Sequence, residues 1–168
     1  MDQRGFTLVE MMMTVCIMAA LIALATMQFG SMNQKSGVES QTKMLFGDLV
    51  ALRSQALYKR TTRSVVILPA KFSTYSSATT SGSALNQRVL TYPVINSNAA
   101  ATQQINFDGW GTATGSPAVN PDPSTGLSIC VAADNQGAYD SVVITSLRIS
   151  MGKLTKGAGC SIANIVTN

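Results

Sequence analysis

The sequence predicts an α+β fold in which one long N-terminal α-helix packs on a small antiparallel β-sheet head. Two observations lead to this prediction. An apolar block near the N-terminus continues, without a proline, into a segment with helical periodicity that reaches about Lys59. The rest of the chain, residues 61–168, alternates short β-branched runs with polar turns and loops. A chain of 168 residues has room for one such head beside a membrane segment.

The first half of the predicted helix contains an apolar run from Met11 to Phe29 without a charged residue. At a rise of 1.5 Å per residue, about 19 residues cross most of a roughly 30 Å hydrocarbon core. We therefore expect residues 6–30 to form a hydrophobic helix that spans a membrane once. Arg4 precedes the run, so the positive-inside rule places residues 1–5 in the cytoplasm and the head on the other side.

The second half of the helix, residues 31–60, is predicted to be amphipathic. Apolar residues recur there at helical spacing and should face the sheet: Val38, Leu45, Leu49, Leu52 and Ala56. Four charged residues should face solvent or neighbouring molecules: Lys35, Glu39, Lys43 and Asp48. Gly30, Gly37 and Gly47 each weaken a helix by about 1 kcal/mol relative to Ala, which favours local bending or melting.

The head is predicted to contain six strands, placed by β-branched and alternating apolar runs. We expect them at residues 64–68, 88–95, 104–107, 126–132, 141–144 and 147–150. Turn residues separate them at Asp108-Gly109, Asn135-Gln136-Gly137 and Met151-Gly152. Residues 73–83 and 111–126 are predicted to be long exposed loops, because Ser, Thr, Pro, Gly and Asn are frequent there.

Composition argues against an enzyme. The chain contains no histidine, which excludes imidazole as base, acid or metal ligand. No nucleophile–base set or phosphate-binding loop occurs, so we expect no catalytic residue, cofactor or metal site. Oxygen ligands around the glycine turn between Asp134 and Asp140 are the nearest approach to a calcium loop. They lack a bidentate Glu, and a plain hairpin turn is the favoured interpretation.

The cysteines match no zinc or iron–sulfur spacing. Cys16 lies in the apolar block, whereas Cys130 and Cys160 lie in the head. If the head is exported to an oxidising compartment, a Cys130–Cys160 disulfide is the natural hypothesis, closing the last strands and the tail into a loop. Two unpaired thiols in a reduced protein are the alternative.

Two features of the head have both a structural and a binding interpretation. The basic cluster from Lys59 to Arg63 is expected to be the solvated end of the helix, where cations complement the helix dipole. Contact with DNA, lipid headgroups or a neighbouring subunit is the alternative. Trp110 stands between two glycines and is expected to pack over the sheet, with a role as an interface anchor as the alternative.

Glu10 is unusual, because a carboxylate within an apolar segment costs about 2.5 to 3.5 kcal/mol on insertion scales and commonly marks function. It also argues against an ordinary secretory signal peptide cut at Ala23-Leu24-Ala25, in which that position would be apolar. The motif Gly5-Phe6-Thr7-Leu8-Val9-Glu10 resembles the cleavage and methylation site of type IV pilins, minor pilins and type II secretion pseudopilins.

This resemblance implies a pilin-like fold and a processing scheme. Residues 1–5 would be a prepilin leader that the prepilin peptidase removes by cutting between Gly5 and Phe6. Phe6 would become the N-methylated terminus, and Glu10 the glutamate at the fifth mature position that helps subunits join a filament. Glu10 would then neutralise the terminal ammonium of Phe6 in a neighbouring subunit, a charge pair inside a low-dielectric helix bundle.

The head resembles the GspH/FimT-type minor pilins and pseudopilins. The segment Leu49-Val50-Ala51-Leu52-Arg53-Ser54-Gln55-Ala56-Leu57 is similar to that branch's helix end, and Ile105-Asn106-Phe107-Asp108-Gly109 and residues 126–131 to its later strands. One member of this branch binds DNA through a Gly-Arg-x-Arg motif. The aligned stretch here is Gly152-Lys153-Leu154-Thr155-Lys156, in which Lys and Thr replace the two arginines. Lys153, Lys156 and Arg148 are therefore possible DNA or anion contacts, with a polar turn as the favoured interpretation.

The resemblance implies a minor pilin or pseudopilin that assembles into, or primes, a type IV pilus or a type II secretion pseudopilus. A filament-displayed binding module for DNA uptake or for surface or substrate capture is the alternative. The implied partners are other pilin or pseudopilin subunits, the prepilin peptidase and an inner-membrane assembly platform. The implied location is the bacterial inner membrane, with the head in the periplasm, and then the pilus or pseudopilus.

Overall fold

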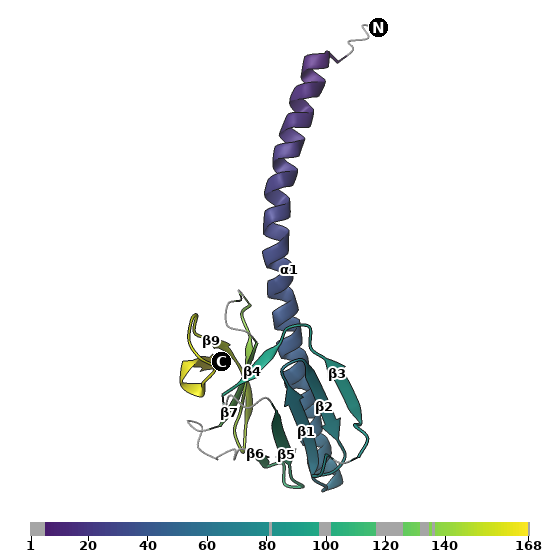
Figure 1. Ribbon diagram of the computed structural model, residues 1–168, viewed down its shortest axis with the longest axis vertical. Coiled ribbons are helices and arrows are strands. Elements are labelled where there is room, and N and C mark those ends of the chain that lie inside the picture. The colour runs from purple at the N-terminus through teal and green to yellow at the C-terminus, as the bar shows by residue number, and fades with distance from the viewer. Residues whose placement is uncertain are drawn as a thin grey trace.

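The computed structural model describes residues 6–80, 82–97, 102–116, 126–131, 135 and 137–167, with the backbone alone at 25–28 and 116. One helix, α1 (Leu8–Lys59), runs for 52 residues without a break and projects far beyond the head (Figure 1). At 1.5 Å per residue it is about 80 Å long. The melting expected at Gly30, Gly37 and Gly47 is wrong, since all three lie in regular helix. The helix ends as predicted, with Arg60 in the left-handed conformation as its C-cap.

The described residues of the head form two five-stranded sheets whose paired strands are antiparallel. The first sheet has the order β3-β2-β1-β5-β6 and the second the order β10-β9-β8-β7-β4. The strands of the first are β1 (Arg63–Leu68), β2 (Lys71–Tyr75), β3 (Asn86–Val89), β5 (Gln103–Phe107) and β6 (Ala113–Ser116). Those of the second are β4 (Val94–Asn96), β7 (Leu127–Val131), β8 (Ser141–Ile144), β9 (Ile149–Leu154) and β10 (Ile165–Thr167), preceded by the short 3-10 helix η1 (Ile162–Asn164).

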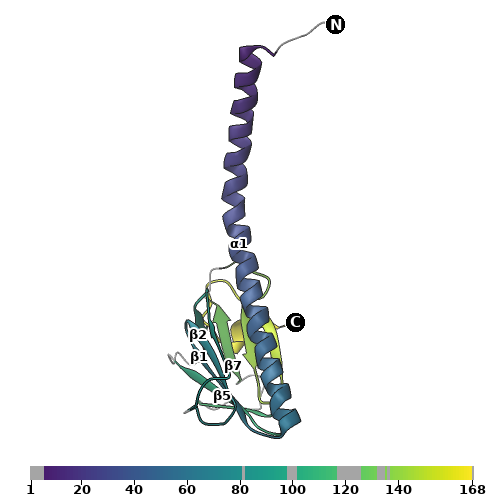
Figure 2. The same cartoon turned by 90° about the vertical axis from the view of Figure 1, so that its right-hand side faces the viewer.

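Both sheets pack against the second half of α1 and share one core (Figure 2). The predicted stripe is confirmed, because all five of its residues are buried: Val38, Leu45, Leu49, Leu52 and Ala56. The first sheet contributes Val65, Ile67, Phe72, Ile105 and Phe107, and the second contributes Leu127, Ile129, Val142 and Ile144. In β1, β5, β7 and β8 these core residues alternate along the strand, as its two-residue period requires.

Polar contacts add to this apolar packing and fix the helix on the head. The Gln41 side chain donates to the Tyr92 carbonyl at 2.6 Å and accepts from the Tyr92 amide at 3.0 Å. Glu39 and Asp48, expected to face solvent or neighbours, instead contact the head. A Glu39 carboxylate oxygen accepts from the Ala138 amide at 2.7 Å, and Asp48 forms an ion pair with Arg88 of β3 at 2.8 Å.

The expected strand at 88–95 is wrong, because the chain changes sheets within it. Proline has no amide hydrogen, and at Pro93 it interrupts the run. The Tyr92 amide is bonded to Gln41 rather than to a strand, and the chain enters the second sheet at Val94. The expected loop at 73–83 begins three residues later than its polar composition indicated, because β2 ends at Tyr75. Residues 71–75 form β2, which is hydrogen-bonded to strands on both sides and buries Phe72.

Two further expectations about loops are wrong. Met151 and Gly152 are not a turn; they lie inside β9, between β8 and β10. Residues 113–116 form β6 at the edge of the first sheet, while 117–125 lie outside the described residues. Strand β10 was not predicted at all. Its three residues are β-branched and favour a strand, but so short a run is weak evidence alone, and the strand forms by pairing with the edge of β9.

Candidate functional site

The N-terminal end of α1 carries two of the predicted processing residues. Phe6 is 77% exposed and lies just before the helix. Thr7 is the N-cap, and its hydroxyl oxygen accepts a hydrogen bond from the Glu10 amide at 3.3 Å. Thr7 and Glu10 have the spacing of a capping box, a helix-start signal that the sequence analysis did not use. Gly5 lies outside the described residues.

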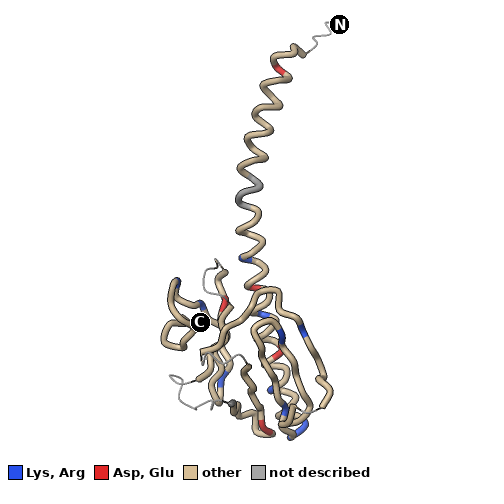
Figure 3. The backbone as a smooth tube through the Cα atoms, viewed as in Figure 1, with Lys and Arg blue, Asp and Glu red and all other residues tan. Residues whose placement is uncertain are grey.

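The first half of α1 projects beyond the head, and its described apolar side chains are exposed (Figure 1). Met11 is 58% exposed and Leu24 69%, values that a side chain buried in a folded core does not have. Figure 3 shows one acidic position near the start of the helix and no further charge until the helix approaches the head. One stretch, with mean hydropathy 2.3, is long and apolar enough to cross a membrane. Such a surface requires lipid or other helices around it.

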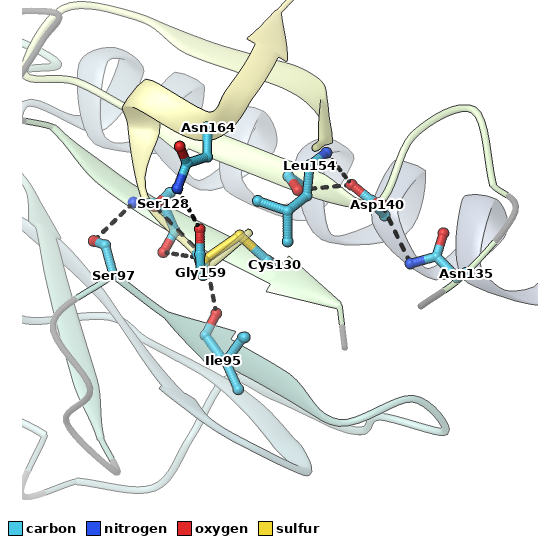
Figure 4. Close-up of a disulfide and its surroundings, with 11 residues drawn as sticks. Ile95, Ser97, Ser128, Cys130, Asn135, Asp140, Leu154, Gly159 and Asn164 are labelled. Carbon is cyan, nitrogen blue, oxygen red and sulfur yellow. Dashed lines mark hydrogen bonds between the residues drawn. A yellow bond between two sulfur atoms is a disulfide. The ribbon is translucent and has the colours of Figure 1, made fainter. Parts of the chain in front are cut away.

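The disulfide predicted between Cys130 and Cys160 is present, with the Cα atoms 5.9 Å apart (Figure 4). It joins β7 to the segment between β9 and β10. Beneath that segment lies a second small cluster formed by Cys130, Val143, Leu154 and Ile165 on the face of the second sheet opposite the main core. The Asn164 side chain donates to the Gly159 carbonyl at 3.0 Å and closes the tail on itself.

Asp140 is the centre of a buried polar network and has no exposed surface. The Lys153 ammonium lies 2.6 Å from one carboxylate oxygen, and the Leu154 amide donates to the other at 2.7 Å. The Ser141 hydroxyl and the Asn135 side-chain amide donate to Asp140 as well (Figure 4). This carboxylate therefore serves the fold. No group of metal-binding side chains occurs among the described residues, and Asp134 and Gln136 lie outside them.

A family model for the prokaryotic N-terminal methylation motif matches residues 1–26. This match covers both the processing residues and most of the exposed apolar half of α1. The rest of the chain forms the predicted long helix packed on antiparallel sheets. The chain therefore joins a prepilin-type N-terminal motif to a pilin-like architecture. The motif implies processing by a prepilin peptidase and assembly with other pilins, and the apolar helix implies anchoring in a membrane before assembly.

Two crystal structures of the type IV minor pilin FimU from Pseudomonas aeruginosa are similar to this pilin-like chain. One is 21% identical over 67% of this chain and 90% of FimU, with a TM-score of 0.47. The other is 20% identical over 71% and 87%, with a TM-score of 0.45. No curated protein matches the sequence.

The three cations considered for DNA contact do not form one cluster. Arg148 precedes β9 and Lys156 follows it, so the six residues of the strand separate them by roughly 20 Å. Lys153 lies near the second end, but its ammonium group already donates to Asp140 and to two oxygens of Asn135. A cation held by an internal carboxylate is a weak partner for a phosphate, because binding would have to break the buried ion pair.

Trp110 was expected to pack over the sheet, and this expectation is wrong. Its side chain is 87% exposed. It stands in the tight turn after β5, which was predicted at Asp108-Gly109, and the Gly111 amide closes that turn on the Asp108 carbonyl at 2.9 Å. Beside it lies an open depression of about 360 Å³ lined by Leu57, Arg60, Gly109 and Trp110. The alternative interpretation, an interface anchor, agrees with this exposure.

Proposed function

We propose that this pilin-like protein is a minor pilin or pseudopilin that assembles into, or primes, a type IV pilus or a type II secretion pseudopilus. The observation that carries the proposal is the exposed apolar half of α1, which has no charged residue from Met11 to Phe29 and lies largely within the methylation motif. Such a surface is stable in a membrane and again in a bundle of like helices. A subunit that moves from the first environment to the second needs no catalytic site, and we propose that the protein is not an enzyme.

In the proposed scheme the peptidase cuts between Gly5 and Phe6 and methylates Phe6. Glu10 then pairs with the Phe6 ammonium of a neighbouring subunit, which offsets the cost of holding a carboxylate among apolar helices. The head is placed in the periplasm, because Arg4 belongs on the cytoplasmic side. An inner-membrane assembly platform would move the subunit into the filament.

The first test is the intact mass and N-terminal sequence of the protein isolated from membranes without reductant. A chain that begins at methylated Phe6 and is lighter by the two hydrogens of the Cys130–Cys160 bond is expected. A chain that begins at Thr26 would identify a freely secreted domain and would contradict the proposal.

Deletion of the protein distinguishes a type IV pilus subunit from a type II secretion pseudopilin. It also distinguishes a structural subunit from a displayed binding module. Loss of filaments would identify a pilus subunit, and loss of secretion a pseudopilin. Intact filaments with lost DNA uptake would favour display of a binding head. DNA binding stays a prediction, and salt-dependent retention of DNA by the protein tests it.

A further inference from the structure

The end of the head farthest from the anchor carries a surface that the assembly scheme does not explain. We call it the distal patch and define it by the four residues that line the depression: Leu57, Arg60, Gly109 and Trp110. Figures 1 and 2 show the C-terminal end of α1 and the end of β5 at this extremity, opposite the N-terminus. The adjoining last helical turn adds an 89% exposed Tyr58 and the cation of Lys59.

The turn that carries Trp110 is rigid. One carboxylate oxygen of Asp108 accepts from the Trp110 amide at 2.9 Å and from the Thr112 amide at 2.8 Å. The Arg53 guanidinium, on the helix, donates to the Gly111 carbonyl at 2.8 Å. The backbone that carries the exposed indole is therefore held in place before any partner binds, so binding loses little backbone entropy.

The two glycines around Trp110 allow this turn to pack closely against the end of the helix. A Cβ atom at Gly109 would lie 3.0 Å from the Arg60 backbone, and one at Gly111 would lie 2.8 Å from the Leu57 side chain. Gly111 also has a φ of 76°, a backbone conformation that residues other than glycine rarely adopt. The helix end and the turn thus line the depression together, and the Trp110 side chain stays exposed beside it.

The chemistry of the distal patch fits a protein partner that brings a carboxylate beside an apolar side chain. Within the described parts of the chain, neither Lys59 nor Arg60 has an ion-pair partner. Trp, Tyr and Arg are the residues that most often dominate protein interfaces. Two cations are few for a nucleic acid, whose affinity grows with the number of neutralised phosphates, and the Asp108 carboxylate lies in the same turn.

The direction of α1 indicates which protein the distal patch would bind. If the apolar halves of α1 bundle in parallel, every head points its distal patch away from the membrane. Subunits enter from the membrane, so the molecule ahead of the patch is a subunit that entered earlier. We propose that the distal patch docks on the anchor-facing side of the head of the preceding pilin-type subunit, with Trp110 as the apolar anchor and Arg60 paired to a carboxylate. This inference rests on the proposed function.

The experiment uses the full-length protein in the cells that produce it, with Trp110 replaced by the photoreactive amino acid benzoylphenylalanine. The matched control carries the same probe at Val89, which is 82% exposed on β3 of the same head. After irradiation, crosslinked peptides from the filament fraction are identified by mass spectrometry. The expected product joins position 110 to an Asp- or Glu-containing peptide on the anchor-facing side of another chain with a prepilin-type N-terminus. No such product is expected from the Val89 control.

A crosslink to nucleic acid, to lipid or to a protein without that N-terminus would overturn the inference, as would a yield no higher than at Val89. Independently, we expect W110A and R60E to lower incorporation into filaments at least about tenfold, the effect of losing an interface hot spot, whereas V89A changes nothing. Lysine in place of the crosslinked partner carboxylate should rescue R60E.

The two proposals fail in different ways. If wild-type protein keeps its leader or never enters filaments, the proposed function fails. If W110A is processed at Phe6 and incorporated at the wild-type level, the distal patch has no docking role while the proposed function stands. Unfolding of W110A provides the folding control, and it should match the wild type because the removed side chain is exposed.

Discussion

Gly37 and Gly47 lie in the same helix, but the space around their Cα atoms differs. A Cβ atom at Gly47 would meet nothing within 4 Å, so G47A should stabilise the protein by about 1 kcal/mol through helix propensity. A Cβ atom at Gly37 would overlap the hydroxyl of Tyr92 and lie 2.8 Å from Cε2 of that ring. The backbone of Tyr92 is held by Gln41, so the ring must leave its packed position.

We therefore expect G37A to be less stable than G47A by at least about 1 kcal/mol in urea unfolding of the detergent-solubilised protein. Replacing Tyr92 with Leu supplies the control, since G37A in that background should gain stability as G47A does. Equal stabilities of G37A and G47A in the wild-type background would show that the ring moves without cost.

The ion pair between Asp140 and Lys153 gives a second prediction at this scale. K153M leaves the carboxylate of Asp140 buried without its cation, and such a change costs about 3 to 5 kcal/mol where the pair is fully buried. The lower part of that range applies here, because the Lys153 side chain is 36% exposed and water can partly replace it. The free energy of unfolding measures the effect.

K71M is the matched control, because Lys71 is a partly exposed lysine on a strand of the other sheet; it should change stability by no more than about 0.5 kcal/mol. The double variant D140N/K153M should be more stable than K153M alone, because no buried charge is then left without a partner. A K153M protein as stable as K71M would mean that Lys153 is free to serve another role, DNA contact included.

At the scale of elements, the disulfide holds the tail on the second sheet. It closes a separation of 30 residues, for which loop-closure entropy predicts about 3 to 4 kcal/mol of stabilisation. In the C130S/C160S variant we expect hydrogen exchange to rise in residues 155–167, including β10. Exchange in the buried stretch of α1 from Val38 to Ala56 should change far less, because that core does not contain the second cluster.

C16S is the control for the number of cysteines, since Cys16 is a free thiol in the anchor. Its exchange pattern should match that of the wild type. Equal protection of residues 155–167 with and without the disulfide would mean that β10 pairing and the cluster around Leu154 hold the tail without the covalent link.

Elements whose causes are local were predictable from the sequence, whereas elements that depend on distant contacts were not. The stripe from Val38 to Ala56 and the β-branched residues of β1 carry their own period, and both predictions are confirmed. Polar β2 is a strand because β1 and β3 pair with it, and β10 is one because β9 does. No residue within either segment signals those partners.

The same division applies to the candidate sites. The methylation motif was predicted from its resemblance to prepilin N-termini and the disulfide from the expected export of the head, and the N-terminal family match and the structure agree with them. The role of Lys153 depended on a buried carboxylate 13 residues away in sequence, and the exposure of Trp110 depended on contacts of its turn with the helix end. Those contacts arise only from the folded arrangement.

At the scale of the whole molecule, the protein has two halves with different solvent requirements. The head buries its apolar residues against its own part of α1, whereas the first half of α1 leaves them exposed. Glu10 is the only charged residue between Phe6 and Phe29. Its carboxylate therefore opposes residence in lipid and, in the proposed assembly, favours residence in the helix bundle.

Because the Glu10 carboxylate should have opposite effects in the membrane and in the filament, the E10V variant tests its proposed role in assembly. Removing the carboxylate saves insertion cost, at most the roughly 2.5 to 3.5 kcal/mol of a charge at a helix centre, so the variant should resist alkaline extraction from membranes at least as well as the wild type. Incorporation into filaments should fall, because the Phe6 ammonium of a neighbouring subunit loses its counter-charge among apolar helices. A variant that was only misfolded would lose both properties. If E10V assembles as efficiently as the wild type, the Phe6 ammonium must be neutralised by another group, and the apolar surface of α1 alone would drive the transfer from membrane to filament.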